Sequence, residues 1–154
     1  MTEAVVAGAI AVAALNVAPA VLGAWLWYWG EPTERGARAF WILLRIGQGA
    51  VLMLAIAVGS LAAAGKHSRE GLFYLYALLP LAVSFVAEQL RVASAQLVLD
   101  QRGLEDAQAV GRLDEHAQRH LVALIVRREV GVMALSAAVV VFLALRAAST
   151  AHGF

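Results

Sequence analysis

The chain has 154 residues, of which 62% are hydrophobic and only 15% are charged. An ordinary soluble domain is about 45–50% apolar and about 25% charged, so a soluble enzyme core and a disordered chain are both poor interpretations. The formal net charge of +1 is too small for a nucleic-acid-binding protein. The chain has no cysteine, which excludes disulfides, thiolate metal sites and cysteine nucleophiles.

Four apolar segments are long enough to cross a bilayer as helices. A helix needs roughly 20 mostly apolar residues to cross a hydrocarbon core of about 30 Å. We therefore predict membrane spans at about 4–29, 41–65, 71–92 and 126–146. The first is expected to be a retained helix rather than a signal peptide, because it lacks a basic leading region and exceeds the apolar core of such a peptide.

The short connections between these segments predict antiparallel neighbours in a single domain that covers residues 1–154. The expected fold class is all-α, an integral membrane four-helix bundle. The third and fourth helices are expected to extend into the cytoplasm as a helical hairpin, with breaks at Gly103 and Gly111 and an N-cap at Asp114. The apolar residues of this hairpin would pack on one another or dock a partner protein.

The distribution of basic residues predicts the orientation in the membrane. Nine of the 12 Lys and Arg residues lie in or beside the first and last connections between spans. The others, Lys66, Arg69 and Arg146, lie on the side of the two termini. Because the more basic side normally faces the cytoplasm, we expect a multi-pass protein of the cell membrane with both termini outside the cytoplasm.

Five ionisable residues are expected at one depth, the cytoplasmic edge of the hydrocarbon. Counting 1.5 Å per residue from the outer ends of the second, third and fourth spans brings them to this level. They are Arg45, Glu88, Arg91, Arg127 and Glu129. Glu88 and Arg91 are i,i+3 neighbours of opposite charge, and a pairing of Glu88 with Arg127 across the hairpin is expected.

Two interpretations of this charged layer remain open. In the structural one, the side chains pair with one another or reach the headgroup boundary. In the functional one, they form a polar pocket for a lipid phosphate, a quinone carbonyl or another amphiphile. Arg128 adds a further guanidinium, so arginines outnumber the two glutamates and favour an anionic ligand. Direct pairs would favour the structural interpretation, and a cleft with room for a ligand would favour the functional one.

Three polar residues lie near the middle of the membrane spans, namely Asn16, Ser84 and Ser136. In lipid such groups need partners inside the bundle, so we expect hydrogen bonds between helices. The alternative is a substrate site beside the bend that Pro19 should introduce. No ionisable residue lies at the midplane, which argues against proton-coupled transport.

None of the four histidines lies within a predicted span, which excludes a bis-His haem inside the bundle. His116 and His120 share one helix face, but two ligands do not complete a zinc site. The order of residues typical of a catalytic triad and a phosphate-binding loop are both absent. We therefore predict no metal and no cofactor, and the catalytic residues are unknown.

The leading hypothesis is a non-catalytic membrane protein that acts as an oligomeric scaffold or accessory subunit, with the lipid bilayer, a second copy or another membrane protein as partner. Small residues on the fourth span, Gly131, Ala134 and Ala138, permit close helix packing, and we expect at least a dimer. The alternative is an amphiphile-binding protein or membrane enzyme, for a lipid or quinone, with its site at the charged layer.

Overall fold

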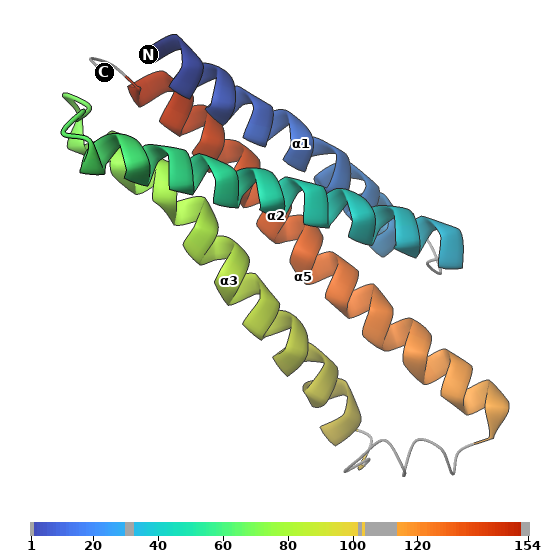
Figure 1. Cartoon of the computed structure of the whole chain (residues 1–154). Helices are drawn as coiled ribbons and strands as arrows, with labels where there is room; N and C mark the ends of the chain where they lie inside the picture. The colour runs from blue at the N-terminus through green and yellow to red at the C-terminus, as the bar shows by residue number, and fades with distance from the viewer. Residues whose placement is uncertain (1, 30–32, 102, 104–113, 152–154) are drawn as a thin grey trace.

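The computed structural model describes residues 2–29, 33–101, 103 and 114–151. Over these residues it contains four long helices and no strand (Figure 1). They are α1, Thr2–Trp29; α2, Glu34–Ala63; α3, Gly71–Asp100; and α5, Glu115–Thr150. Each is long and apolar enough to cross a membrane, so the predicted all-helical class with four candidate spans is confirmed.

Local sequence signals mark the starts of α2 and α5 and the end of α3. The Thr33 hydroxyl accepts a hydrogen bond of 3.1 Å from the Gly36 amide at the start of α2. Asp114 accepts one of 3.1 Å from the Ala117 amide at the start of α5, which confirms the predicted N-cap. Gly103 follows the end of α3 with a φ of 65°, a conformation that favours glycine, so this expected break is also confirmed. The other expected break, Gly111, lies outside the described residues.

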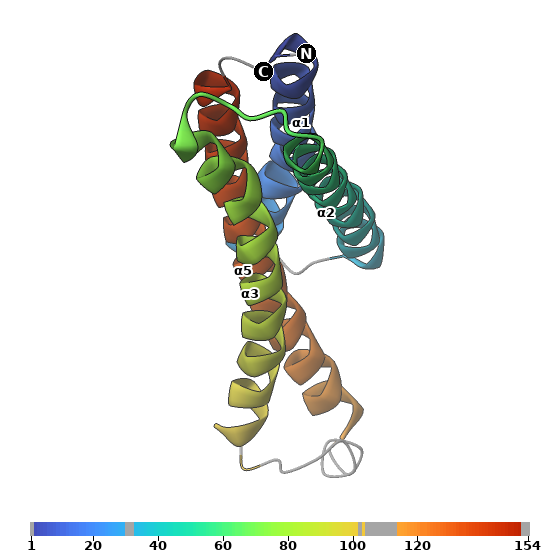
Figure 2. The same ribbon diagram turned by 60° about the vertical axis from the view of Figure 1, so that its left-hand side comes forward.

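Helix α5 is the central helix of the bundle and packs along both α1 and α3 (Figures 1 and 2). Helix α2 packs mainly on α1, and it diverges from α3 with distance from their connection. The start of α1 and the end of α5 lie at the same end of the bundle as that connection. At the opposite end, α3 and α5 continue side by side beyond the end of α1. These extensions explain why both helices are longer than the membrane spans expected at 71–92 and 126–146.

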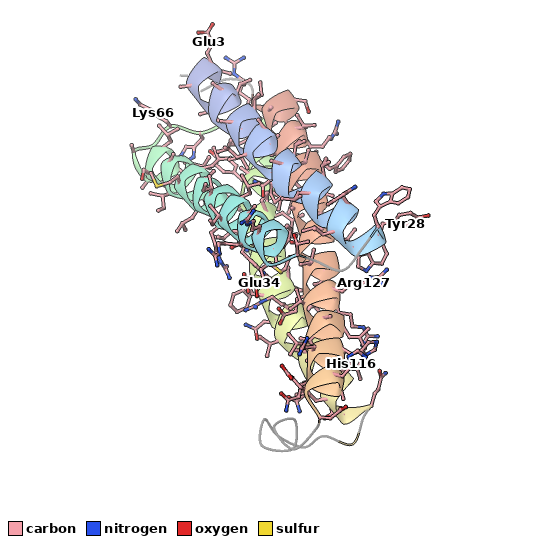
Figure 3. The ribbon with its side chains drawn as sticks, turned by 90° about the vertical axis from the view of Figure 1, so that its right-hand side faces the viewer. Glu3, Tyr28, Glu34, Lys66, His116 and Arg127 are labelled. Carbon is pink, nitrogen blue, oxygen red and sulfur yellow. The ribbon has the colours of Figure 1, made fainter. Side chains whose placement is uncertain are left out.

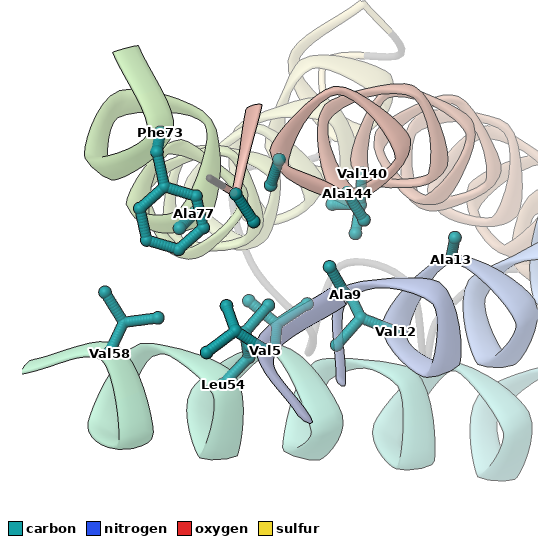
Figure 4. Close-up of a cluster of buried hydrophobic side chains, with 13 residues drawn as sticks. Val5, Ala9, Val12, Ala13, Leu54, Val58, Phe73, Ala77, Val140 and Ala144 are labelled. Atoms are coloured by element: carbon teal, nitrogen blue, oxygen red, sulfur yellow. The ribbon is translucent and has the colours of Figure 1, made fainter. Parts of the chain in front are cut away.

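Two clusters of buried side chains form the core. The cluster nearer the chain termini joins all four helices (Figure 4), with Val5, Ala9, Val58, Phe73, Ala77, Val140 and Ala144 among its members. The second cluster lies nearer the α1–α2 connection and contains Leu26, Phe40, Leu44, Ala87, Val130, Met133 and Ala134. Many of these residues are small, which lets the helix backbones approach closely. Inside a membrane, such close van der Waals packing is what holds helices together, because lipid supplies no hydrophobic driving force between them.

The small residues of α5 pack against α1 within the chain. An added Cβ at Gly131 would lie 2.8 Å from Trp27 Cδ1, and Ala134 is buried against Gly23. Ala138 is the one member of this predicted stripe that is exposed. The bundle therefore already uses most of the stripe on which we based the expected dimer, and the dimer itself stays a prediction.

Asn16 is the most deeply buried polar side chain near the middle of α1, with 2% of its surface exposed. Its amide donates to the Val12 carbonyl at 2.9 Å and to the Gly47 carbonyl of α2 at 3.4 Å. An added Cβ at Gly47 would lie only 2.7 Å from Asn16 Oδ1, so glycine is what permits this contact. The expected hydrogen bond between helices is confirmed here, and it favours packing over a substrate site beside Pro19.

The two serines expected near the midplane, Ser84 and Ser136, behave differently from Asn16. The Ser84 hydroxyl donates to the Pro80 carbonyl, and the Ser136 hydroxyl donates to the Met133 carbonyl, each at 2.8 Å. Both bonds lie within one helix, so the expectation of hydrogen bonds between helices was wrong for these residues. A serine can satisfy its hydroxyl on the preceding turn of its own helix and needs no partner from another.

Candidate functional site

Four of the five charged residues expected at one level come together where α2, α3 and α5 face one another. Arg45 Nη1 lies 2.5 Å from Glu88 Oε1. On α3, Arg91 Nε donates to Glu88 Oε2 at 3.0 Å, as the i,i+3 spacing predicted. Arg91 Nη1 also lies 3.7 Å from Glu129 Oε2 on α5. We call Arg45, Glu88, Arg91 and Glu129 the ion-pair cluster.

Two further residues of α2 complete this cluster. Gln48 donates to Glu88 Oε1 at 3.2 Å and accepts from Arg45 Nη1 at 2.6 Å. The Arg91 guanidinium lies 5.3 Å from the centre of the Trp41 ring, which is within the range of a cation–π contact. Neither residue was predicted from the sequence. Their spacing from Arg45, at i−4 and i+3, was the signal that could have placed them on the same face of α2.

Arg127 does not belong to the ion-pair cluster, and the expected pairing of Glu88 with Arg127 was wrong. Its Nε donates to the backbone carbonyl of Trp27 at 2.9 Å. Figure 3 shows Arg127 on α5 near the end of α1 that carries Tyr28. Residues i and i+2 of an α-helix, such as Arg127 and Glu129, lie about 200° apart around its axis. Because Glu129 faces α3, Arg127 must face away from it toward α1.

The ion-pair cluster is electrically balanced, with two arginines and two glutamates. Glu88, Arg91 and Glu129 are partly buried, whereas the Arg45 side chain is 54% exposed. Glu88 is the centre of the cluster because it contacts both arginines and Gln48. The side chains are thus closed into direct pairs that join three helices.

A groove of about 750 Å³ lies beside the cluster, between the diverging helices α2 and α3. Arg45 and Glu88 form its polar end, and apolar residues such as Leu52, Leu78 and Leu81 line its length. The groove therefore combines an apolar wall with a charged end, as an amphiphile site requires.

None of the described histidines lies in the ion-pair cluster or lines the groove between α2 and α3. His67, His116 and His120 are exposed, and Figure 3 shows His116 on the extension of α5; His152 lies outside the described residues. Within the described part of the chain, no three His, Asp or Glu side chains are close enough to hold a metal ion. The absence of a metal or haem from the functional protein stays a prediction.

Comparison of the chain with protein-family models, with curated proteins and with solved structures found no match.

Proposed function

We propose that this chain is a non-catalytic integral membrane protein that acts as a scaffold or accessory subunit in the bilayer. The observation that carries this proposal is the closure of the ion-pair cluster into direct contacts. A catalytic acid or base must reach its substrate and exchange a proton with it. Here Glu88 and Glu129 instead contact guanidinium groups of the same chain, and these contacts link α2, α3 and α5.

The proposed orientation places the α3–α5 extensions in the cytoplasm and both termini outside. The chain has no cysteine, so single cysteines can be introduced without background labelling. His67 and Gln101 are both exposed and lie at opposite ends of α3. We expect a membrane-impermeant maleimide to label His67→Cys in intact cells and to label Gln101→Cys only after the membrane is permeabilised. Labelling of Gln101→Cys in intact cells would reverse the proposed topology.

A scaffold should associate with copies of itself or with another membrane protein. We expect native mass spectrometry in a mild detergent to show multiples of the 16.3 kDa chain. A control is dilution over a hundredfold range of protein concentration, which separates a specific assembly from chance occupancy of one micelle. A monomer at every concentration, with no other protein bound, would contradict the scaffold proposal.

The groove between α2 and α3 favours a second candidate function, the binding of a lipid or quinone with its polar end at Arg45. Gly49 lines this groove, and an added Cβ there would meet nothing within 4 Å. Gly49→Leu should therefore fill the groove without disturbing the fold. If the purified protein retains a lipid or quinone that Gly49→Leu loses at unchanged stability, the amphiphile-binding function replaces the scaffold.

A further inference from the structure

A second apolar groove lies between α1 and α5. It has a volume of about 510 Å³ and is lined by small residues of both helices, including Ala20, Ala24, Gly131 and Ala138. These residues lack the side-chain length to fill the space between the helices. The groove thus presents an apolar surface, between α1 and α5, that an acyl chain would contact.

The groove continues into a hollow of about 560 Å³ at the end of α1. The two spaces are neighbours, because Trp27 and Arg128 line both of them. The second hollow is more polar, and its lining includes Gln101 and Arg127. One continuous surface therefore passes from small apolar side chains to two adjacent guanidinium groups.

The charge at this end of the groove is not balanced by the described part of the chain. Arg127 uses its Nε on the Trp27 carbonyl, which holds the guanidinium against the end of α1. Arg128 is exposed and forms no ion pair with a described residue. Neither hollow has an acidic residue among the described residues that line it, and the neighbouring Glu129 faces Arg91 instead. Two positive charges thus lie where the apolar groove ends.

The dimensions match one acyl chain in one leaflet. From Arg128 to Ala138, α5 rises by about 15 Å, which is half of a hydrocarbon core of about 30 Å. Trp27 lies at the charged end, and tryptophan is enriched at the boundary between headgroups and hydrocarbon. The groove therefore extends from the level of the headgroups to the middle of the membrane.

We infer that this groove binds a phospholipid with a net negative headgroup, with an acyl chain along α1 and α5 and its phosphate at Arg127 and Arg128. Guanidinium groups bind phosphate oxygens through paired N–H donors. A zwitterionic headgroup carries an ammonium beside its phosphate, which two guanidinium groups would repel. This site uses different residues from the ion-pair cluster, so it stands or falls separately from the proposed scaffold function.

The inference can be tested with the purified chain in a mild non-ionic detergent, by native mass spectrometry and by heat denaturation. The probes are dioleoyl-phosphatidylglycerol, dioleoyl-phosphatidylcholine and inorganic phosphate. We expect phosphatidylglycerol to bind with one-to-one stoichiometry and to raise the melting temperature. The phosphatidylcholine with identical chains should bind more weakly, and inorganic phosphate alone should give no comparable stabilisation.

Two kinds of substitution test the contacts of the lipid headgroup and of the acyl chain separately. Arg127→Gln and Arg128→Gln should each weaken phosphatidylglycerol binding by about fivefold, whereas Arg146→Gln on the other side of the membrane should not. Ala138→Leu should fill the groove and weaken binding, with Ala14→Leu on an exposed position of α1 as the matched control. Arg128 has no described partner, so its substitution leaves the packing of the bundle intact.

Equal binding of the two lipids, or unchanged binding by Arg128→Gln, would overturn the inference. Stabilisation by inorganic phosphate equal to that by the lipid would show an anion site without an acyl groove. Oligomers that persist in Arg128→Gln while lipid binding is lost would leave the scaffold proposal standing.

Discussion

Replacing Glu88 with alanine is expected to destabilise the bundle by about 2–3 kcal/mol, which lies between the values for exposed and fully buried ion pairs. The substitution leaves Arg45 and Arg91 without the carboxylate that they share at 2.5 Å and 3.0 Å. It also removes the acceptor of the Gln48 amide. Arg91 keeps Glu129, which limits the loss. The free energy of unfolding can be measured by denaturation with sodium dodecyl sulfate in mixed micelles.

Three comparisons make this result specific. Glu115→Ala breaks an exposed i,i+4 pair with Arg119 and should change stability by about 1 kcal/mol or less. Arg45→Ala should be non-additive with Glu88→Ala, because the two side chains are direct partners. Arg127→Ala should be additive, since Arg127 contacts Trp27 instead. Additive behaviour of Arg45 and non-additive behaviour of Arg127 would mean that the ion-pair cluster is wrongly assigned.

Gly23→Ala is expected to destabilise the bundle by about 1–3 kcal/mol through overpacking. An added Cβ at this position would lie 2.5 Å from Phe40 Cε2 and 2.6 Å from Ala134 Cβ. The Ala134 methyl group has no rotamer through which it could move aside, and the Phe40 ring is fully buried. Helices α1, α2 and α5 would therefore have to separate. The same detergent denaturation measures the effect.

Gly59→Ala provides the matched control for this prediction. Gly59 lies on an exposed part of α2, and an added Cβ there would meet nothing within 4 Å. The substitution should be neutral or stabilise the helix by up to about 1 kcal/mol, because alanine has the higher helix propensity. If Gly23→Ala were as well tolerated as Gly59→Ala, the close approach of the three helices would be wrong.

The sequence alone predicted the four helices and most of their local ends. A membrane span must satisfy every backbone hydrogen bond within itself, so a long apolar segment implies a helix whatever it packs against. Asp114 and Gly103 were likewise predictable, because a cap and a left-handed turn residue act on their immediate neighbours. The length of an apolar segment, however, predicts the part of a helix that can lie in the membrane, and it does not predict where the whole helix begins and ends. For this reason α2 begins at Glu34 and α3 continues to Asp100, outside the predicted spans.

The common level of the charged residues along the bundle was predictable, but most of their pairing was not. A fixed rise per residue places Arg45, Glu88 and Glu129 at one level, and the i,i+3 spacing pairs Glu88 with Arg91. Partners on different helices depend on how each helix is rotated about its own axis. That rotation follows from the packing of small residues such as Gly23 and Gly131 against bulky neighbours on other helices.

Only the tertiary structure therefore decided that Glu129 rather than Arg127 faces α3, and that Gln48 and Trp41 join the cluster. The same packing turned Arg127 toward Trp27 and produced the groove along α1 and α5. The sequence determined where the helices form and at what level along the bundle their residues lie, because these depend on local hydrogen bonding and apolar length. The faces that meet depend on side-chain shape across helices distant in the sequence, which no local pattern records.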